Sequence, residues 1–263
     1  MLHVSAGFQQ VFQQLGLTSC ESVVRHFLGR EIPAEAVSVR AAALKLPDGS
    51  SVAVYYKQYE YASPAWKFIG RASKARCEFR NYETFVQLGI SAAEPIACGE
   101  QRDGLGRLRR AFILTRAIPA AMTLTDFVQK RCADRGDATS REMRECLLRQ
   151  LAGMTHRIHA AHFFHHDLVW RNILVTWTPP GDPKLWWIDC PRGRFDRWSP
   201  SRYRRRLKDL ASLDKVAAQL CSARERIAFV KQYLGKSRLD PEAKKLVRDT
   251  LSYRKRRWPD DWK

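Results

Sequence analysis

The spacing of apolar residues is helical at the start of the chain and then becomes alternating. Before residue 37 these residues recur at intervals of three and four, from Phe8 to Leu15 and from Val23 to Leu28, which predicts two helices. Ser19 stands where the second helix would take its N-cap. From residue 37 the pattern is strand-like, at 37–40, 43–46 and 51–59, and the turn signal Pro47-Asp48-Gly49 predicts a β-hairpin.

Helical spacing returns from about residue 73 to residue 88. The expected apolar stripe of this helix consists of Ala75, Phe79, Tyr82 and Val86. Two more strands are expected after it, one beginning at 97–99 and one at 110–115, with a glycine-containing turn between them. The first part of the chain is therefore expected to form an antiparallel sheet with one prominent helix.

Helices dominate the second part of the sequence. Thr123 and Asp126 have the spacing of a helix cap. Apolar residues at helical spacing predict a long helix over 143–162 and another through 207–216, which carries Asp209. The pattern as a whole predicts the α+β class, with an antiparallel-sheet domain over 1–118 and a mainly helical domain over 119–263.

The stretch HHDLVWRN at 165–172 matches the kinase catalytic-loop pattern H-R-D-L-x-x-x-N at every fixed position except one, where His166 replaces the arginine. In that chemistry an aspartate accepts or orients the substrate hydroxyl, and an asparagine and a later aspartate hold magnesium ions on the ATP phosphates. Asp167, Asn172 and Asp189 stand at the required separations. Strand-like segments at 173–176 and 185–188, joined by a turn at 179–183, predict a hairpin that returns Asp189 to Asn172.

Lys57 lies in the predicted strand over 51–59, which resembles the V-A-I-K strand whose lysine contacts ATP phosphates in kinases. A glutamate on the following helix must then hold this lysine. Glu78 is the expected partner and Glu83 is the second choice. The alternative is that the lysine and the glutamate are both ordinary solvated residues.

The charge of the chain is strongly positive, with 46 Lys and Arg against 27 Asp and Glu, a net charge of +19. Such a surface is expected to bind something anionic: nucleic acid, an anionic membrane surface or a phosphorylated substrate. No apolar run is long enough to span a bilayer, and the first residues lack the pattern of a signal peptide. The seven cysteines include no C-x-x-C pair, which is typical of reduced thiols in a cytosolic protein.

Two clusters leave alternatives open. Seven arginines between Arg192 and Arg206, interleaved with Phe195, Trp198 and Tyr203, form either a solvated arm or a docking surface, and the C-terminal end is basic again with Trp258 and Trp262. Five histidines between 156 and 166 raise the possibility of a zinc site. With no H-E-x-x-H pattern and no cysteine nearby, no metal cluster is expected there.

Taken in order, the lysine strand, the glutamate helix, the loop and the Asp189 strand resemble the protein-kinase-like fold. The segments 73–90 and 188–193 resemble the lipopolysaccharide kinases of Gram-negative bacteria, the Kdo and heptose kinase group, and the likeness spans roughly 37–213. It implies a two-lobed fold, with a small antiparallel-sheet N-lobe that follows a helical extension and a mainly helical C-lobe. It also implies ATP- and Mg²⁺-dependent phosphorylation of a heptose or Kdo hydroxyl of the lipopolysaccharide inner core.

The same resemblance implies a role for each candidate residue. Asp167 would be the catalytic base, Asn172 and Asp189 the magnesium ligands, and Lys57 with Glu78 the phosphate-positioning pair. Arg171 is expected to neutralise charge on the transferred phosphoryl group. The expected partner is an anionic glycolipid, bound by a cytoplasmic protein in peripheral contact with the inner membrane through its basic surface. Nucleic acid is not expected as a partner, and the oligomeric state is left open.

The sequence also departs from the pattern of regulated protein kinases. No G-x-G-x-x-G precedes Lys57, Asp-Cys-Pro stands in place of Asp-Phe-Gly, and no A-P-E follows. These departures make a protein substrate less expected. The alternatives are a kinase for another small molecule or a protein, a pseudokinase scaffold, and a nucleic-acid-binding protein, in which basic and aromatic residues also interleave.

Overall fold

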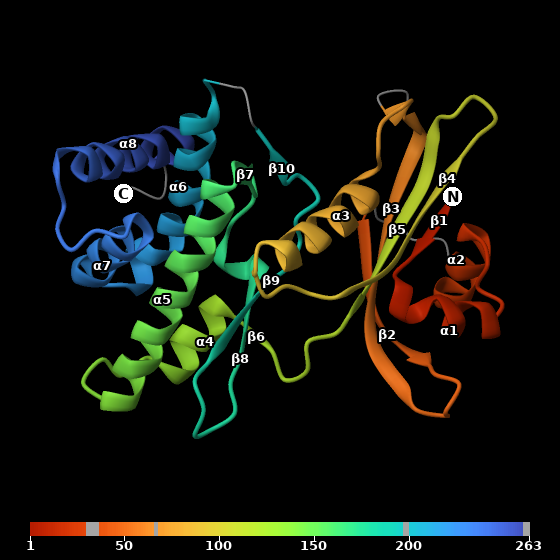
Figure 1. Cartoon of the computed structure of the whole chain (residues 1–263), viewed down its shortest axis with the longest axis horizontal. Coiled ribbons are helices and arrows are strands. Elements are labelled where there is room, and N and C mark those ends of the chain that lie inside the picture. Colours follow the sequence, from red (N-terminus) through yellow and green to blue (C-terminus); the bar gives the residue numbers. More distant parts are fainter. Residues whose placement is uncertain (30–36, 66–67, 197–199, 260–263) are drawn as a thin grey trace. The chain divides into compact units, whose positions relative to one another are not determined.

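The computed structural model describes residues 1–29, 37–65, 68–196 and 200–259. The chain divides into two compact units, one formed by Met1–Thr84 and Ala93–Ile118 and the other by Phe85–Ala92 and Pro119–Lys263. Together they give a mixed fold of helices and antiparallel sheets (Figure 1). Several residues of the predicted basic and aromatic clusters lie outside the described residues: Arg197, Trp198 and Trp262.

The first unit is built on a five-stranded antiparallel sheet with the order β1-β4-β5-β3-β2. Helices α1 and α2 lie on one face of this sheet and α3 lies on the other (Figure 1). The predicted hairpin is confirmed, because β2 and β3 pair along their length with a turn at 46–50. The elements are β1 (Leu2–Val4), a 3-10 turn (Ala6–Phe8), α1 (Gln9–Gln14), α2 (Cys20–Leu28), β2 (Val37–Lys45), β3 (Ser51–Ala65), α3 (Lys74–Gln87), β4 (Pro95–Arg102) and β5 (Leu108–Arg116).

The α2 face of the sheet forms an apolar core of this unit. Ser19 caps α2 as predicted, in a reciprocal capping box with Ser22. Gly99 of β4 lets the helix approach closely, because a Cβ there would lie 2.2 Å from Phe112 and 3.0 Å from the sulfur of Cys20. The buried members of this cluster come from the 3-10 turn, both helices, the loop between them and four strands: Phe8, Phe12, Leu17, Cys20, Val23, Val24, Leu28, Leu44, Val54, Tyr56, Ile96, Ala97, Phe112 and Leu114.

Helix α3 confirms the predicted helix, but its stripe differs at the C-terminal end. Ala75, Phe79 and Tyr82 are buried as expected, whereas Val86 is 68% exposed and Phe85 is fully buried in its place. Phe85 packs edge-on against Phe163 and Trp187. These partners are distant in sequence, so helical spacing alone pointed to the wrong residue.

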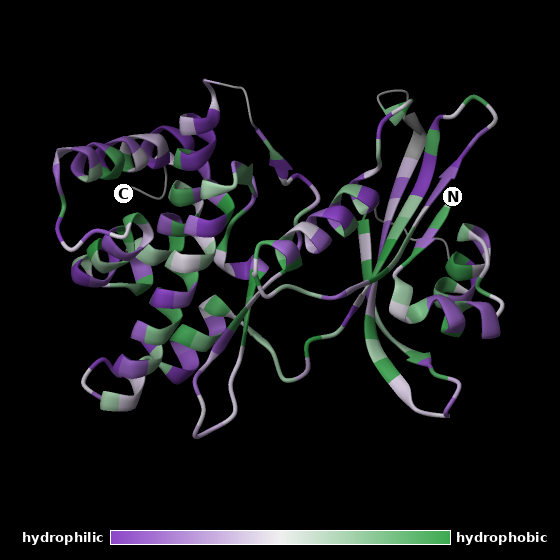
Figure 2. Ribbon diagram, viewed as in Figure 1, coloured by the Kyte–Doolittle hydropathy of each residue, from purple (hydrophilic) through white to green (hydrophobic). Residues whose placement is uncertain are grey.

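The second unit is mainly helical, and hydrophobic and hydrophilic residues alternate along α5 and α8, as amphipathic helices require (Figure 2). The predicted long helix is confirmed but begins earlier, at Ala138, where Asp137 caps it. Thr123 caps α4 as predicted. The elements are β6 (Met122–Thr123), α4 (Leu124–Arg131), α5 (Ala138–Ala160), β7 (Phe163–Phe164), a 3-10 turn (Trp170–Asn172), β8 (Ile173–Thr176), β9 (Lys184–Trp187), β10 (Arg194–Phe195), α6 (Arg202–Leu220), α7 (Ala223–Leu234) and α8 (Pro241–Arg257).

These helices enclose an apolar cavity and a buried ion-pair network. An apolar cavity of about 310 Å³ lies among α4, α5, α6, α7 and α8. Arg254 of the basic C-terminal run is buried, and it forms an ion pair with Asp214, which also pairs with Arg226. Among the described residues, no helix is long and apolar enough to cross a membrane.

Candidate active site

Lys57 of β3 and Glu78 of α3 meet in the first unit, as the sequence predicted. The Lys57 Nζ lies 3.1 Å from Glu78 Oε2 and 3.4 Å from Oε1, and the two side chains are 16% and 3% exposed. The second choice, Glu83, is exposed on the same helix. A buried ion pair of this kind keeps its geometry only when the carboxylate has further donors.

Two tyrosines supply those donors, and neither was predicted from the sequence. Tyr59 donates its hydroxyl to Glu78 Oε2 at 2.9 Å, and Tyr82 donates to Oε1 at 3.1 Å. The Lys57 ammonium also lies 5.2 Å from the centre of the Tyr59 ring, within reach of a cation–π contact. The sequence spacing could have indicated both tyrosines as neighbours of the ion pair, because Tyr59 is two residues after Lys57 and Tyr82 is one helical turn after Glu78.

In the second unit a hairpin brings Asp189 back toward the loop, as predicted. Strands β8 and β9 pair from Ile173–Trp187 to Thr176–Lys184. The Ile188 amide donates to the Asn172 carbonyl at 3.0 Å, and the Asn172 side-chain amide donates to the Asp167 carbonyl at 3.0 Å. Asp189 has a positive φ of 57°, a left-handed conformation that is uncommon outside glycine.

Asp209 of α6 supports the loop, a role that the sequence did not predict for it. Its carboxylate is fully buried and accepts the backbone amides of His165 and His166, both at 2.8 Å. His159 lies 3.4 Å from the same carboxylate and 2.8 Å from the Tyr233 hydroxyl. Burial raises the pKa of Asp209, but bonding to His159, the nearby histidines and the His165 amide outweigh it and hold this pKa below its ordinary value.

The two histidines of the loop are held in the neutral form. Burial lowers the pKa of His166 to about 4, and it lowers the pKa of the fully buried His165 as well. His165 stacks on Phe85 and meets Trp187 edge-on. These contacts give the loop that contains Asp167 and Asn172 a packed, apolar base.

We therefore expect the unfolding free energy to decrease as the pH falls from about 6.5 to about 4. In this window the unfolded chain takes up protons on His165 and His166 that the native chain does not bind, so protonation favours unfolding. Urea denaturation across the window measures the slope. The variant His166→Gln should have a flatter profile, whereas the same change at the exposed His26 should not. Equal slopes in wild type and His166→Gln would contradict this explanation.

Arg171 is exposed, whereas several of the arginines between Arg192 and Arg206, the arginine run, are paired within the chain. Arg171 is 74% exposed, with its guanidinium 4.0 Å from the Asp167 carboxylate. In the run, Arg205 pairs with the buried Asp196, and Arg206 donates to the Tyr233 hydroxyl. Part of the run therefore bonds to other residues of the chain. Among the residues that the structure describes, its exposed arginines are Arg192, Arg194 and Arg204.

The chain is similar to known proteins in its sequence and in its fold. The model of the family described as "Lipopolysaccharide kinase (Kdo/WaaP) family" matches residues 62–233, which include every candidate except Lys57. A solved structure of "WaaP in complex with acyl carrier protein" is 21% identical, with full coverage of both chains and a TM-score of 0.71, so it shares the fold. A search of curated proteins found no match. Since the family model covers well over half of the chain, the chain belongs to the lipopolysaccharide kinase (Kdo/WaaP) family and is an ATP-dependent phosphotransferase acting on a lipopolysaccharide sugar.

Proposed function

We propose that this chain transfers the γ-phosphate of ATP to a heptose or Kdo hydroxyl of the lipopolysaccharide inner core, through a two-lobed kinase arrangement. The observation that carries the proposal is the set of backbone and side-chain bonds joining the segments of Asp167, Asn172 and Asp189. Phosphoryl transfer depends on positioning such groups around one phosphate, more than on covalent chemistry by the protein. The family membership supports the sugar acceptor.

Asp167 is the proposed base. Its side chain is 39% exposed, so an acceptor hydroxyl can reach it, while its main chain is fixed through the carbonyl that accepts from Asn172. A carboxylate in hydrogen-bond reach of the hydroxyl takes up its proton as the oxygen attacks phosphorus. Arg171, exposed beside it, is proposed to meet the negative charge of the transferred group.

ATP and Mg²⁺ are the proposed cofactors, and the residues fit them. Asn172 and Asp189 offer amide and carboxylate oxygens, the hard ligands that Mg²⁺ prefers. Asn172 uses its side-chain nitrogen to bond Asp167, which leaves its amide oxygen for a metal. Bound magnesium would neutralise charge on the phosphate oxygens. Lys57, held by Glu78, is proposed to contact the α and β phosphates.

The basic surface is proposed to hold the chain at the cytoplasmic face of the inner membrane, next to its glycolipid acceptor. Each basic residue close to an anionic leaflet contributes about 1 kcal/mol. Helix α8 presents a set of exposed cations that could act together: Lys244, Lys245, Arg248, Lys255, Arg256 and Arg257. This contact requires no membrane-spanning segment.

The acceptor is tested with two dephosphorylated core glycolipids, one ending in Kdo and one extended by heptose. Each is incubated with ATP, Mg²⁺ and the purified chain, and the product is analysed by mass spectrometry. We expect one added phosphate on one of the two glycolipids, and fragmentation identifies the sugar that carries it. Absence of phosphate on both, with transfer to a soluble sugar or a protein instead, would overturn the lipopolysaccharide acceptor.

We also propose that an acyl carrier protein binds this chain, as one does in the similar structure of WaaP. The supporting observation is the apolar cavity of about 310 Å³, which lies at the lower end of ligand-pocket volumes of about 300–1,000 Å³. Trp170 of the catalytic loop and Tyr233 line it, together with leucines of α5 and α6. An acyl chain is a ligand that such an apolar wall accepts.

Leu148→Trp is expected to weaken acyl binding at least tenfold, because the larger tryptophan side chain takes up volume in the cavity that Leu148 lines. Binding is measured with a fluorescent long-chain fatty acid and then with an acylated carrier protein. Leu105→Trp, the same change at an exposed turn outside the cavity, should leave both affinities unchanged. Equal affinities in the two variants would contradict the assignment of the cavity.

A further inference from the structure

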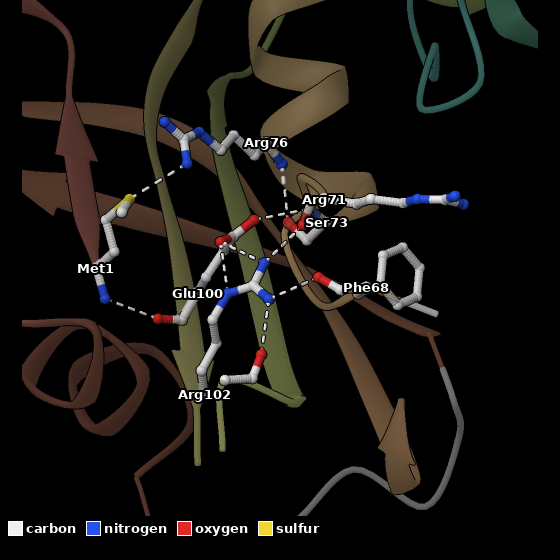
Figure 3. Close-up of polar contacts among 8 residues, drawn as sticks. Met1, Phe68, Arg71, Ser73, Arg76, Glu100 and Arg102 are labelled. Carbon is white, nitrogen blue, oxygen red and sulfur yellow. Dashed lines mark hydrogen bonds and ion pairs between the residues drawn. The ribbon is translucent and has the colours of Figure 1, made fainter. Parts of the chain in front are cut away.

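A buried polar cluster in the first unit connects strand β4 to the beginning of α3 (Figure 3). Glu100 is 3% exposed, and its Oε1 accepts the Ser73 amide at 2.7 Å. Its Oε2 accepts Arg102 Nε at 3.2 Å and Nη2 at 2.9 Å. Burial raises the pKa of Glu100, but the bonds from Ser73 and Arg102 outweigh it, so this pKa lies below its ordinary value and the carboxylate stays charged.

Arg102 uses the rest of its guanidinium to hold the segment that precedes α3. Its Nη1 donates to the carbonyls of Phe68 at 2.8 Å and Gly106 at 3.0 Å, and its Nη2 donates to the carbonyl of Arg71 at 2.8 Å. The planar fork of donors is specific to arginine, so lysine cannot replace it at this point. The 68–71 segment is thus bonded to the sheet by two hydrogen bonds from one side chain.

Ser73 connects the 68–71 segment to the first turn of helix α3. Its hydroxyl accepts the Arg76 amide at 3.1 Å in the manner of an N-cap, and its carbonyl accepts the Cys77 amide at 2.9 Å. Glu78 is the next residue along α3. The sheet register puts Glu100, Ala111 and Tyr59 in one row across β4, β5 and β3, and Tyr59 is itself a donor to Glu78.

We propose that Glu100 and Arg102 are positioning residues for phosphate transfer, because they fix the start of α3 so that Glu78 holds Lys57. The inference rests on the proposed role of Lys57 and Glu78 at the ATP phosphates. Neither Glu100 nor Arg102 contacts the phosphates in this scheme. They act through a rigid helix whose first turn is bonded to the strand next to β5, and β5 pairs directly with the strand of Lys57.

The test is a double-mutant cycle in the full-length chain, read as kcat/KM for ATP. Arg102→Gln is expected to lower this ratio by roughly ten- to a hundredfold, since a displacement of about 1 Å can cost a hundredfold. In a Glu78→Gln background the same change should cost less than about twofold, because no carboxylate remains to be positioned. Arg102→Lys, which keeps the charge, should behave like Arg102→Gln.

Arg107→Gln is the matched control, since Arg107 pairs with Asp103 in the same hairpin at 2.7 Å and should give a nearly unchanged ratio. Hydrogen exchange of the α3 amides should be faster in Arg102→Gln and unchanged in Arg107→Gln. Equal losses in both Glu78 backgrounds, or unchanged α3 exchange, would overturn the positioning role alone. A wild-type chain that transfers no phosphate would instead overturn the proposed function.

Discussion

Replacing Asp167 by asparagine is expected to lower kcat for phosphate transfer by about 10²–10⁴-fold, the usual contribution of a general base. The amide has the same shape but cannot take up the proton of the acceptor hydroxyl. The KM for ATP should change little, because Asp167 is assigned to the acceptor side. The measurement is steady-state transfer to the core glycolipid.

A change in the stability of Asp167→Asn should not explain its lower kcat. The Asp167 side chain is 39% exposed, and the bond from Asn172 goes to its main-chain carbonyl, which the substitution keeps. The unfolding free energy should therefore change by less than about 0.5 kcal/mol. Asp182→Asn, the same change in the exposed β8–β9 turn, should leave kcat unchanged. A kcat near the wild-type value in Asp167→Asn would contradict the assignment of the base.

Replacing Asp209 by alanine is expected to lower the unfolding free energy by about 2–6 kcal/mol, since it leaves one buried and one partly buried backbone donor without an acceptor, at about 1–3 kcal/mol each. The two donors are the amides of His165 and His166, which this carboxylate joins to α6. Phosphate transfer should fall as well, because the loop that carries Asp167 loses its support. Urea denaturation and transfer assays measure the two effects.

The control for this variant is Asp249→Ala on α8. Asp249 pairs with Lys245 and accepts from Tyr203 near the surface, where an ion pair contributes about 0–1 kcal/mol. Asp209→Asn, which keeps one acceptor oxygen, should lie between alanine and wild type. If Asp209→Ala and Asp249→Ala were equally stable, Asp209 would not be the support of the loop.

Much of the fold and the centre of the site could be predicted from the sequence. The hairpin at 37–59, helix α3, the Ser19 and Thr123 caps and the β8–β9 hairpin all follow from local spacing and turn chemistry. The pairing of Lys57 with Glu78 followed from the order of the motifs, and the structure confirms it.

What could not be predicted depends on contacts between distant parts of the chain. Asp209 reaches the loop across about forty residues, and its role is visible only from the two amides that it accepts. Glu100 of β4 meets Ser73, which lies 27 residues earlier just before α3, and no motif marks either residue. The stripe of α3 was wrong at Val86 because the partners of Phe85 come from the second unit's own loop and hairpin.

The pairing of the arginines between Arg192 and Arg206 could not be predicted for a related reason. Spacing shows how many cations a segment has, but not which of them find a carboxylate. Arg205 is paired with Asp196, and the buried Arg254 is paired with Asp214. The exposed cations of α8 other than Lys245, which pairs with Asp249, are the better candidates for an anionic partner.

Phosphate transfer to lipopolysaccharide is tested most directly by following labelled γ-phosphate from ATP into dephosphorylated lipopolysaccharide core, with the purified wild-type chain. We expect label in the glycolipid that requires Mg²⁺, disappears when the metal is chelated and is absent with Asp189→Asn. Label that stays in the nucleotide pool, together with no Mg²⁺-dependent binding of ATP, would contradict the kinase assignment.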